Sequence, residues 1–212
     1  MTIKTLISTE VRKLGESIPC FILPAVLTCP GATSACKGEP SETGKEGYRK
    51  GAICYATRGK IPFHFKRHLA NWDASKENNF TDRIIAEINL LISSSAINGS
   101  TIRRFRIHPA GDFYSQAYLE SWFKIASAFP DIKFLAYTRS YMLDFTGRPD
   151  NMKIFFSIDR STENYPIQKL PIARVICKGD APTPKAHTCA AKCHSCSVCW
   201  HKKIDVDFIK HN

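Results

Sequence analysis

The stretch "TIRRFRIHPAGDFYSQAYLESWFKIASAFPDIKFLAYTRS", residues 101–140, decides the expected fold because three patterns follow one another in it. Apolar and polar residues alternate over residues 101–108, which predicts a strand. An apolar stripe at helical spacing predicts a helix over roughly 115–129, and "IKFLAYTRS" at 132–140 predicts a second strand. A strand, a helix and another strand in this order form the unit of a parallel α/β sheet.

Similar patterns continue on both sides of this unit. Further strands are predicted at 152–160 and 172–179, with a strand-like apolar run at 20–27, and further helices at 62–74 and 81–93. The strand count is nearer five or six than eight, and a complete (β/α)8 barrel takes about 250 residues. We therefore expect an α/β fold with a mainly parallel sheet, arranged as a compact or partial (β/α) barrel.

The composition places the chain among folded proteins. Of its 212 residues, 43% are hydrophobic and 13 are phenylalanine, which excludes a disordered chain. No run of about 18 apolar residues predicts a membrane-spanning helix, and the first residues lack the apolar core and cleavage site of a signal peptide. We expect a single cytoplasmic domain (1–212) with a polar loop inserted at 37–51 and no membrane contact.

Polar residues gather where the predicted strands end. His108 and Asp112 follow the first strand, Arg139 ends the second, and Asp159 ends the third. Strand alternation puts His108 on the same face as Arg106. Because ligands of parallel α/β sheets bind at the carboxyl ends of the strands, these positions are candidates for a substrate or anion pocket. The alternative is ordinary strand-end chemistry, with Asp112 capping the next helix and Arg139 paired with Asp159.

The nine cysteines indicate metal binding, because disulfides are rare in the cytoplasm. Five of them lie in a cysteine-rich segment at 177–200, namely Cys177, Cys189, Cys193, Cys196 and Cys199. The spacing Cys-x2-Cys-x2-Cys within it is typical of iron–sulfur ligands, with a fourth ligand from farther away. Zinc, which takes four Cys or His ligands, is the alternative metal.

A second group of cysteines, Cys29, Cys36 and Cys54, lies near the start of the chain. Cys20 stands apart in an apolar run and is expected to be a buried free thiol. The other eight cysteines could supply two [4Fe-4S] clusters, or one cluster with thiols to spare. The sequence leaves this division open.

The charge favours an anionic partner. The formal net charge is +11, and basic residues concentrate between positions 45 and 68. They are Lys45, Arg49, Lys50, Arg58, Lys60, Lys66 and Arg67, against Glu46. Such an excess favours nucleic acid or another polyanion. The alternative function is accordingly a zinc-stabilised nucleic-acid-binding protein without catalysis.

Several short motifs together carry a resemblance to a known family. They are "TCPGATSAC…CYA" (28–56), "RIHPAGDF" (106–113), "AYTRS" (136–140), "FSID" (156–159) and the terminal "C-x2-C-x2-CW" (193–200). Over about residues 19–200 the chain resembles the bacteriophage "gene product 88" family, which implies the cytoplasm of an infected bacterium.

The "CYA" element with its upstream cysteines is also similar to phage proteins related to radical S-adenosylmethionine (SAM) barrels. That resemblance implies that Cys29, Cys36 and Cys54 hold a [4Fe-4S] cluster with one iron open for SAM, and that Tyr55 lies beside it. It implies a redox or SAM-dependent role on an anionic substrate. Whether the protein is an enzyme, and in which oligomeric state it acts, the sequence leaves open.

Overall fold

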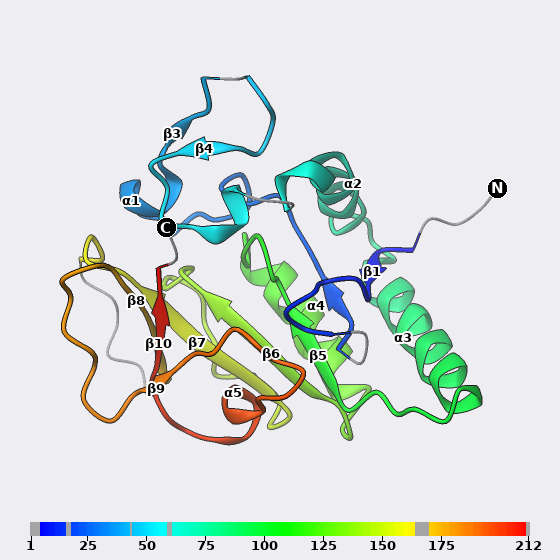
Figure 1. Ribbon diagram of the computed structural model, residues 1–212. Helices are drawn as coiled ribbons and strands as arrows, with labels where there is room; N and C mark the ends of the chain where they lie inside the picture. The colour runs from blue at the N-terminus through cyan, green and yellow to red at the C-terminus, as the bar shows by residue number, and fades with distance from the viewer. Residues whose placement is uncertain (1–4, 16–17, 43, 59–60, 164–169, 211–212) are drawn as a thin grey trace.

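The computed structural model describes residues 5–15, 18–42, 44–58, 61–163 and 170–210 (Figure 1). Its main feature is an eight-stranded sheet of order β1-β2-β5-β6-β7-β8-β10-β9. The strands are β1 (Ile7–Ser8), β2 (Cys20–Phe21), β5 (Arg104–Ile107), β6 (Lys133–Thr138), β7 (Met152–Ile158), β8 (Ile172–Ile176), β9 (His187–Thr188) and β10 (Val206–Ile209). Only the β1–β2 pair is antiparallel among these strands. The sheet is therefore mainly parallel, as expected.

The helices and a small hairpin complete the fold. They are α1 (Ser34–Lys37), α2 (Phe65–Ala74), α3 (Phe80–Ile97), α4 (Gln116–Ser127) and α5 (Val198–His201), the 3-10 turns η1 (Tyr55–Thr57) and η2 (Pro62–His64), and the antiparallel pair β3 (Glu39–Pro40) and β4 (Arg49–Lys50). The hairpin lies within the segment predicted as a polar loop at 37–51. No described helix has both the length and the apolar character needed to cross a membrane.

One face of the sheet packs against α3 and α4 through an aromatic core. Trp122 of α4 is fully buried, and its ring makes edge or tilted contacts with Phe21, Phe80 and Phe105. Aromatic side chains bury large apolar areas, so this layer supplies most of the hydrophobic stabilisation. The apolar alternation of the strands and the helix stripe at 115–129 are confirmed by this packing.

The other face of the sheet is covered by the cysteine-rich segment. Trp200 of α5 is buried against Leu135 and Phe155, in a second and smaller core that also holds Cys20 and Cys199. This segment connects β9 to β10 along the chain, and in Figure 1 it passes across the sheet and carries α5. Two helices thus cover one face of the sheet, and a segment rich in cysteines covers the other.

The segment with α1, β3, β4 and η1 lies at the carboxyl ends of the strands (Figure 1). Two glycines allow this close approach. A Cβ on Gly31 would lie 1.7 Å from the backbone oxygen of Arg139, and a Cβ on Gly111 would lie 2.4 Å from the Cβ of Leu23. Gly111 also has a φ of 84°, which side chains rarely adopt. Any larger residue at Gly31 would push the segment off the sheet edge.

Two expectations about the sheet change. The expected count of five or six strands is wrong, because β1, β9 and β10 span only two to four residues and carry too short a pattern to recognise. The strand order is linear, with β1 and β9 at its edges. No pairing between these two edges occurs among the described strands, so the structure contains an open sheet where a barrel-like closure was expected.

Candidate functional site

Three cysteines from separate segments meet at the carboxyl edge of the sheet. Cys29 precedes α1, Cys36 lies in it, and Cys54 precedes η1. The Cys36 thiol hydrogen-bonds the sulfur of Cys54, and Cys29 interacts electrostatically with both. We call these three residues the edge set. The structure therefore brings together the N-terminal cysteines that the sequence singled out.

The environment of the edge set keeps two of its thiols protonated. Burial, with the nearby Asp112 carboxylate, raises the pKa of Cys29. The hydrogen bond to Cys54 raises the pKa of Cys36 and lowers that of Cys54. Cys54 is thus the thiol that ionises first. A metal cation offsets the cost of burying thiolates, so the set suits metal ligation better than free thiolate chemistry.

A buried ion pair fixes α1 above the strand ends. Arg139 donates to Asp159 at 2.9 Å, and the Asp159 side chain is fully buried. The Thr33 hydroxyl donates to the same carboxylate at 2.9 Å and accepts from the Cys36 backbone N–H at 3.0 Å. Arg139 and Asp159 therefore do pair, and they position Cys36 through Thr33. Sequence reasoning missed Thr33, although a threonine three residues before Cys36 is a helix-cap signal.

Asp112 is a buried structural carboxylate. It accepts from the Thr138 hydroxyl at 2.6 Å and from the backbone N–H groups of Phe113 and Arg139 at 2.7 Å each. Burial nevertheless raises its pKa to about 6. It does not cap the following helix, because Ser115 does so with its own hydroxyl. Asp112 ties the ends of β5 and β6 together beneath the edge set.

His108 does not share a face with Arg106, contrary to the alternation of the strand. Its φ of 53° reverses the side chain into the aromatic core, where it stacks on Tyr118 and contacts Phe113. Nε2 bonds the Tyr118 hydroxyl at 2.8 Å, and burial lowers the pKa of His108 to about 3. The left-handed backbone thus places His108 among core residues, with 2% of its surface exposed. A period-two pattern cannot anticipate such a reversal.

The cysteine-rich segment brings four more thiols together on the sheet face. We call Cys189, Cys193, Cys196 and Cys199 the face set. Burial raises the pKa of Cys189, and the neighbouring Cys193 and Cys196 raise it further. Burial also raises the pKa of Cys199, with a further contribution from Cys189 and Cys193. These four thiols therefore lie within electrostatic reach of one another.

Side chains of the sheet surround the face set. The Tyr137 hydroxyl bonds the sulfur of Cys199, and Arg106 lies 4.2 Å from the Tyr137 ring. His187 Nε2 is 3.7 Å from the sulfur of Cys196. Cys196 therefore has a histidine side chain as a neighbour that could share a metal ion with it.

Arg104 fastens this segment to the sheet. It donates to the backbone oxygens of Cys193 at 3.1 Å and His194 at 3.3 Å.

The remaining two cysteines lie outside these sets. Cys177 follows β8, and its backbone N–H bonds the Asp180 carboxylate at 2.8 Å. Cys20 is fully buried in the second core, as expected, and burial raises its pKa to about 12. Within the described ranges, nothing joins Cys177 to either set, so its predicted role as a ligand stays a prediction.

The donor chemistry of both sets is that of thiol ligands, which iron–sulfur clusters and zinc both accept. Over the residues that the structure describes, no three or more His, Cys, Asp and Glu side chains converge closely enough to hold one metal ion. A cluster spreads its irons over a wider volume, and thiolates are its usual ligands. Binding of a cluster or of zinc by the seven thiols of the two sets therefore stays a prediction.

The basic residues at 45–68 are used in different ways. Arg49 donates to the backbone oxygens of Lys37 and Gly38, and Arg67 donates to that of Ile7 at 3.2 Å. These two side chains stabilise the fold. Lys50 pairs with Glu42. Lys45, Arg58 and Lys66 carry the remaining charge, and Lys60 lies outside the described residues. Contact between this segment and an anionic partner stays a prediction.

No solved structure matches this chain. The model of the Gene product 88 family matches residues 3–202, so the chain belongs to that family. Among its relatives, the Gene 88 protein of Mycobacterium phage L5 is 26% identical over 210 residues, covering 85% of this chain and 81% of the relative. That of Mycobacterium phage D29 is 24% identical over 211 residues, with the same coverage. The expected resemblance to this phage family is confirmed.

Proposed function

We propose that this protein is an iron–sulfur protein of phage-infected cells that binds a [4Fe-4S] cluster through Cys29, Cys36 and Cys54. The observation that carries this proposal is the meeting of three thiols from separate segments at the carboxyl edge of the sheet. Ligands of parallel α/β folds bind at that edge, where the loops converge. A cluster with three protein ligands supplies electron transfer, or an open iron for SAM as in radical-SAM-like partial barrels.

The residues around the edge set have supporting roles in this proposal. Thr33 and the Arg139–Asp159 pair hold α1 and hence Cys36 in place. Tyr55 follows Cys54 directly, and its hydroxyl bonds the backbone oxygen of Pro109. Lys13 lies 3.7 Å from the Tyr55 ring and adds a positive charge beside this edge. A cation here favours an anionic substrate in the cytoplasm of the host.

The face set is a second candidate metal site. Its Cys-x2-Cys-x2-Cys spacing favours a second [4Fe-4S] cluster. The contact between His187 and Cys196 favours zinc instead, because zinc readily takes a mixture of cysteine and histidine ligands. A protein with zinc alone would correspond to a nucleic-acid-binding protein without catalysis.

Metal analysis of the protein purified without oxygen tests both sites. We expect a brown protein that absorbs near 400 nm, with about four irons lost in the triple variant C29S/C36S/C54S. The variant C189S/C193S/C196S/C199S reports on the face set, through either iron or zinc. Cys20→Ala is the matched control, because Cys20 is a buried thiol outside both sets and its removal should leave the metal content unchanged.

The result decides between the assignments. A colourless protein that contains zinc would overturn the cluster proposal. Full iron content in C29S/C36S/C54S would move the cluster to the face set. A change in the spectrum of the cluster on addition of SAM would support an open iron, and an unchanged spectrum would support electron transfer.

A further inference from the structure

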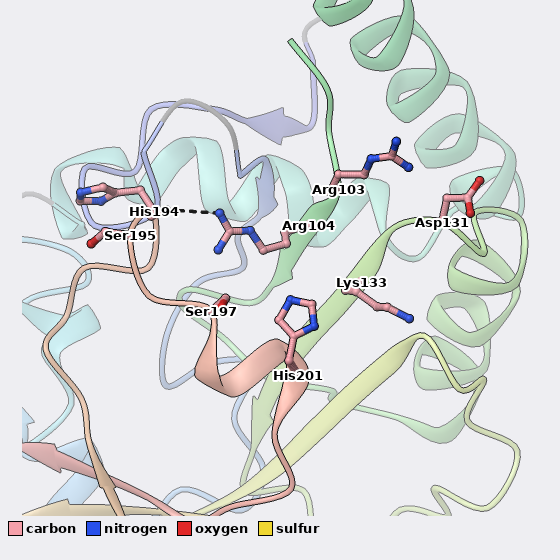
Figure 2. A pocket seen from close by; sticks show the side chains of 8 residues that line it. All are labelled: Arg103, Arg104, Asp131, Lys133, His194, Ser195, Ser197 and His201. Carbon is pink, nitrogen blue, oxygen red and sulfur yellow. Dashed lines mark hydrogen bonds between the residues drawn. The ribbon is translucent and has the colours of Figure 1, made fainter.

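A shallow cavity lies at the amino edge of the sheet, opposite the edge set (Figure 2). It is bounded by the starts of β5 and β6 on one side and by the cysteine-rich segment on the other. Its lining consists of Arg103, Arg104, Asp131, Lys133, His194, Ser195, Ser197 and His201. In Figure 2 the His201 ring rises from α5 between the side chains of Arg104 and Lys133. The lining therefore consists mainly of basic and hydroxyl-bearing residues, with Asp131 as its acidic residue.

The positive charges at this edge extend beyond the cavity. Lys153 begins β7 and Lys203 follows α5, so lysines mark the starts of two neighbouring strands and the adjoining segment. Leu135 of β6 pairs with Lys153 of β7, so Lys133 and Lys153 lie on neighbouring strands at this edge. Burial and then the charges of Lys203 and Lys133 lower the pKa of Lys153, so both charges act on it.

Asp131 is an acidic residue beside these cations, but among the described residues no salt bridge joins it to any of them. Within the ranges that the structure describes, Arg103, Lys133, Lys153 and Lys203 take part in none of the salt bridges. Like charges held together without a counter-charge cost folding free energy, and a bound polyanion would remove that cost. Arg104 differs, since its guanidinium is committed to the backbone of the cysteine-rich segment.

We propose that Arg103, Lys133, Lys153 and Lys203 form a binding site for the phosphodiester backbone of nucleic acid. The cations are spread along the starts of β5, β6 and β7 and the segment after α5 instead of converging on one point, which suits successive phosphates better than a single small anion. The serine hydroxyls of the lining add neutral donors of a kind that commonly contacts phosphate oxygens. The site lies at the opposite edge from the segment 45–68 and does not depend on the cluster assignment.

Binding of a fluorescent single-stranded 20-mer of DNA, followed by anisotropy at several salt concentrations, tests the site. The variant R103A/K133A/K203A is compared with K45A/R58A/K66A, which removes an equal number of positive charges from the segment 45–68. We expect the first variant to bind about tenfold or more weakly and to lower the salt slope by about 2, since each contact to a single strand contributes roughly 0.7. The second should bind like the wild type. Asp131→Asn, which removes the acidic residue from the lining, should strengthen binding about twofold.

Each other outcome overturns the proposal. Equal losses in the two triple variants would indicate a dependence on net charge alone, and a loss only in K45A/R58A/K66A would place the contact in the segment 45–68. Displacement of the 20-mer by inorganic pyrophosphate at the same phosphate concentration would indicate a small-anion site. Circular dichroism of every variant verifies that a loss of binding is not a loss of folding.

Discussion

The edge set and the face set bring thiols together by opposite means. The edge set gathers Cys29, Cys36 and Cys54 from segments up to 25 positions apart, and it depends on a buried ion pair and a glycine contact with β6. The face set comes from one short stretch of chain that lies on a finished sheet. The first is therefore a product of tertiary structure, whereas the second is mainly a product of local spacing. Mutations should separate the two sets accordingly.

Breaking the ion pair of the edge set should have the largest effect. Arg139→Met leaves the Asp159 carboxylate buried without its partner, which costs about 3–5 kcal/mol in free energy of unfolding. Lys50→Met is the matched control, because it breaks the exposed pair with Glu42 and costs at most about 1 kcal/mol. Urea unfolding measures both. Similar losses in the two variants would contradict the buried role of Arg139.

The glycine contact should come next. Gly31→Ala places a Cβ against the backbone oxygen of Arg139, so the loop must move away at a cost of about 3 kcal/mol. Gly147→Ala serves as the control, because its Cβ would meet the Phe123 ring at an ordinary 3.7 Å. Thermal unfolding and the thiol reactivity of the metal-free protein provide the measurement. A stable G31A variant with unchanged thiol reactivity would show that the loop is not seated on β6.

The free energy of unfolding should depend on pH because His108 is buried in the core beneath the edge set. The folded pKa of His108, about 3, lies below the unfolded value of about 6.5, so its stabilising effect is complete above pH 6.5 and is lost as pH falls towards 3. His108→Asn removes this dependence while tolerating the left-handed backbone. The raised pKa of Asp112 acts in the opposite direction and is present in both proteins.

The comparison of the two proteins therefore isolates the histidine. Between pH 7 and pH 5 the wild type should lose about 2 kcal/mol more of its unfolding free energy than H108N. Urea titrations at the two pH values measure this difference. Parallel curves for the two proteins would mean that His108 is accessible to protons in the folded state.

The attachment of the face set should give the smallest effect. Arg104→Ala removes two hydrogen bonds to backbone oxygens at the surface, with an expected loss of about 1 kcal/mol. In the metal-free protein Cys193 should then react faster with a thiol reagent. Arg103→Ala, a neighbouring arginine without these bonds, should leave the rate unchanged. Equal rates in both variants would show that Arg104 does not hold the segment.

The sequence could predict the elements that carry a periodic apolar pattern, and it could not predict features that depend on a single residue or a single long-range contact. Period-two and helical patterns were enough for α2, α3, α4 and the strands β5 to β8, because each buries an apolar stripe. The cysteine positions likewise indicated both thiol sets, although Cys177 was predicted with the C-terminal group and lies outside the face set. The reversal of His108 escaped prediction, because a single positive φ leaves no periodic trace. The salt-bridge chain through Thr33 escaped as well, since its partners are 126 positions apart.

The position of β10 in the sheet has a consequence for the order of synthesis. β10 lies between β8 and β9, and among the described strands it is the neighbour of β9. A ribosome adding 5–20 residues per second completes β10 roughly 8 to 30 s after Cys54 has been made. Asp159, which helps to position the edge set, is translated 50 residues before the end of β10, whereas Cys199 of the face set precedes that end by only 10 residues. A cell that loads metal during translation would therefore meet the two sites in sequence.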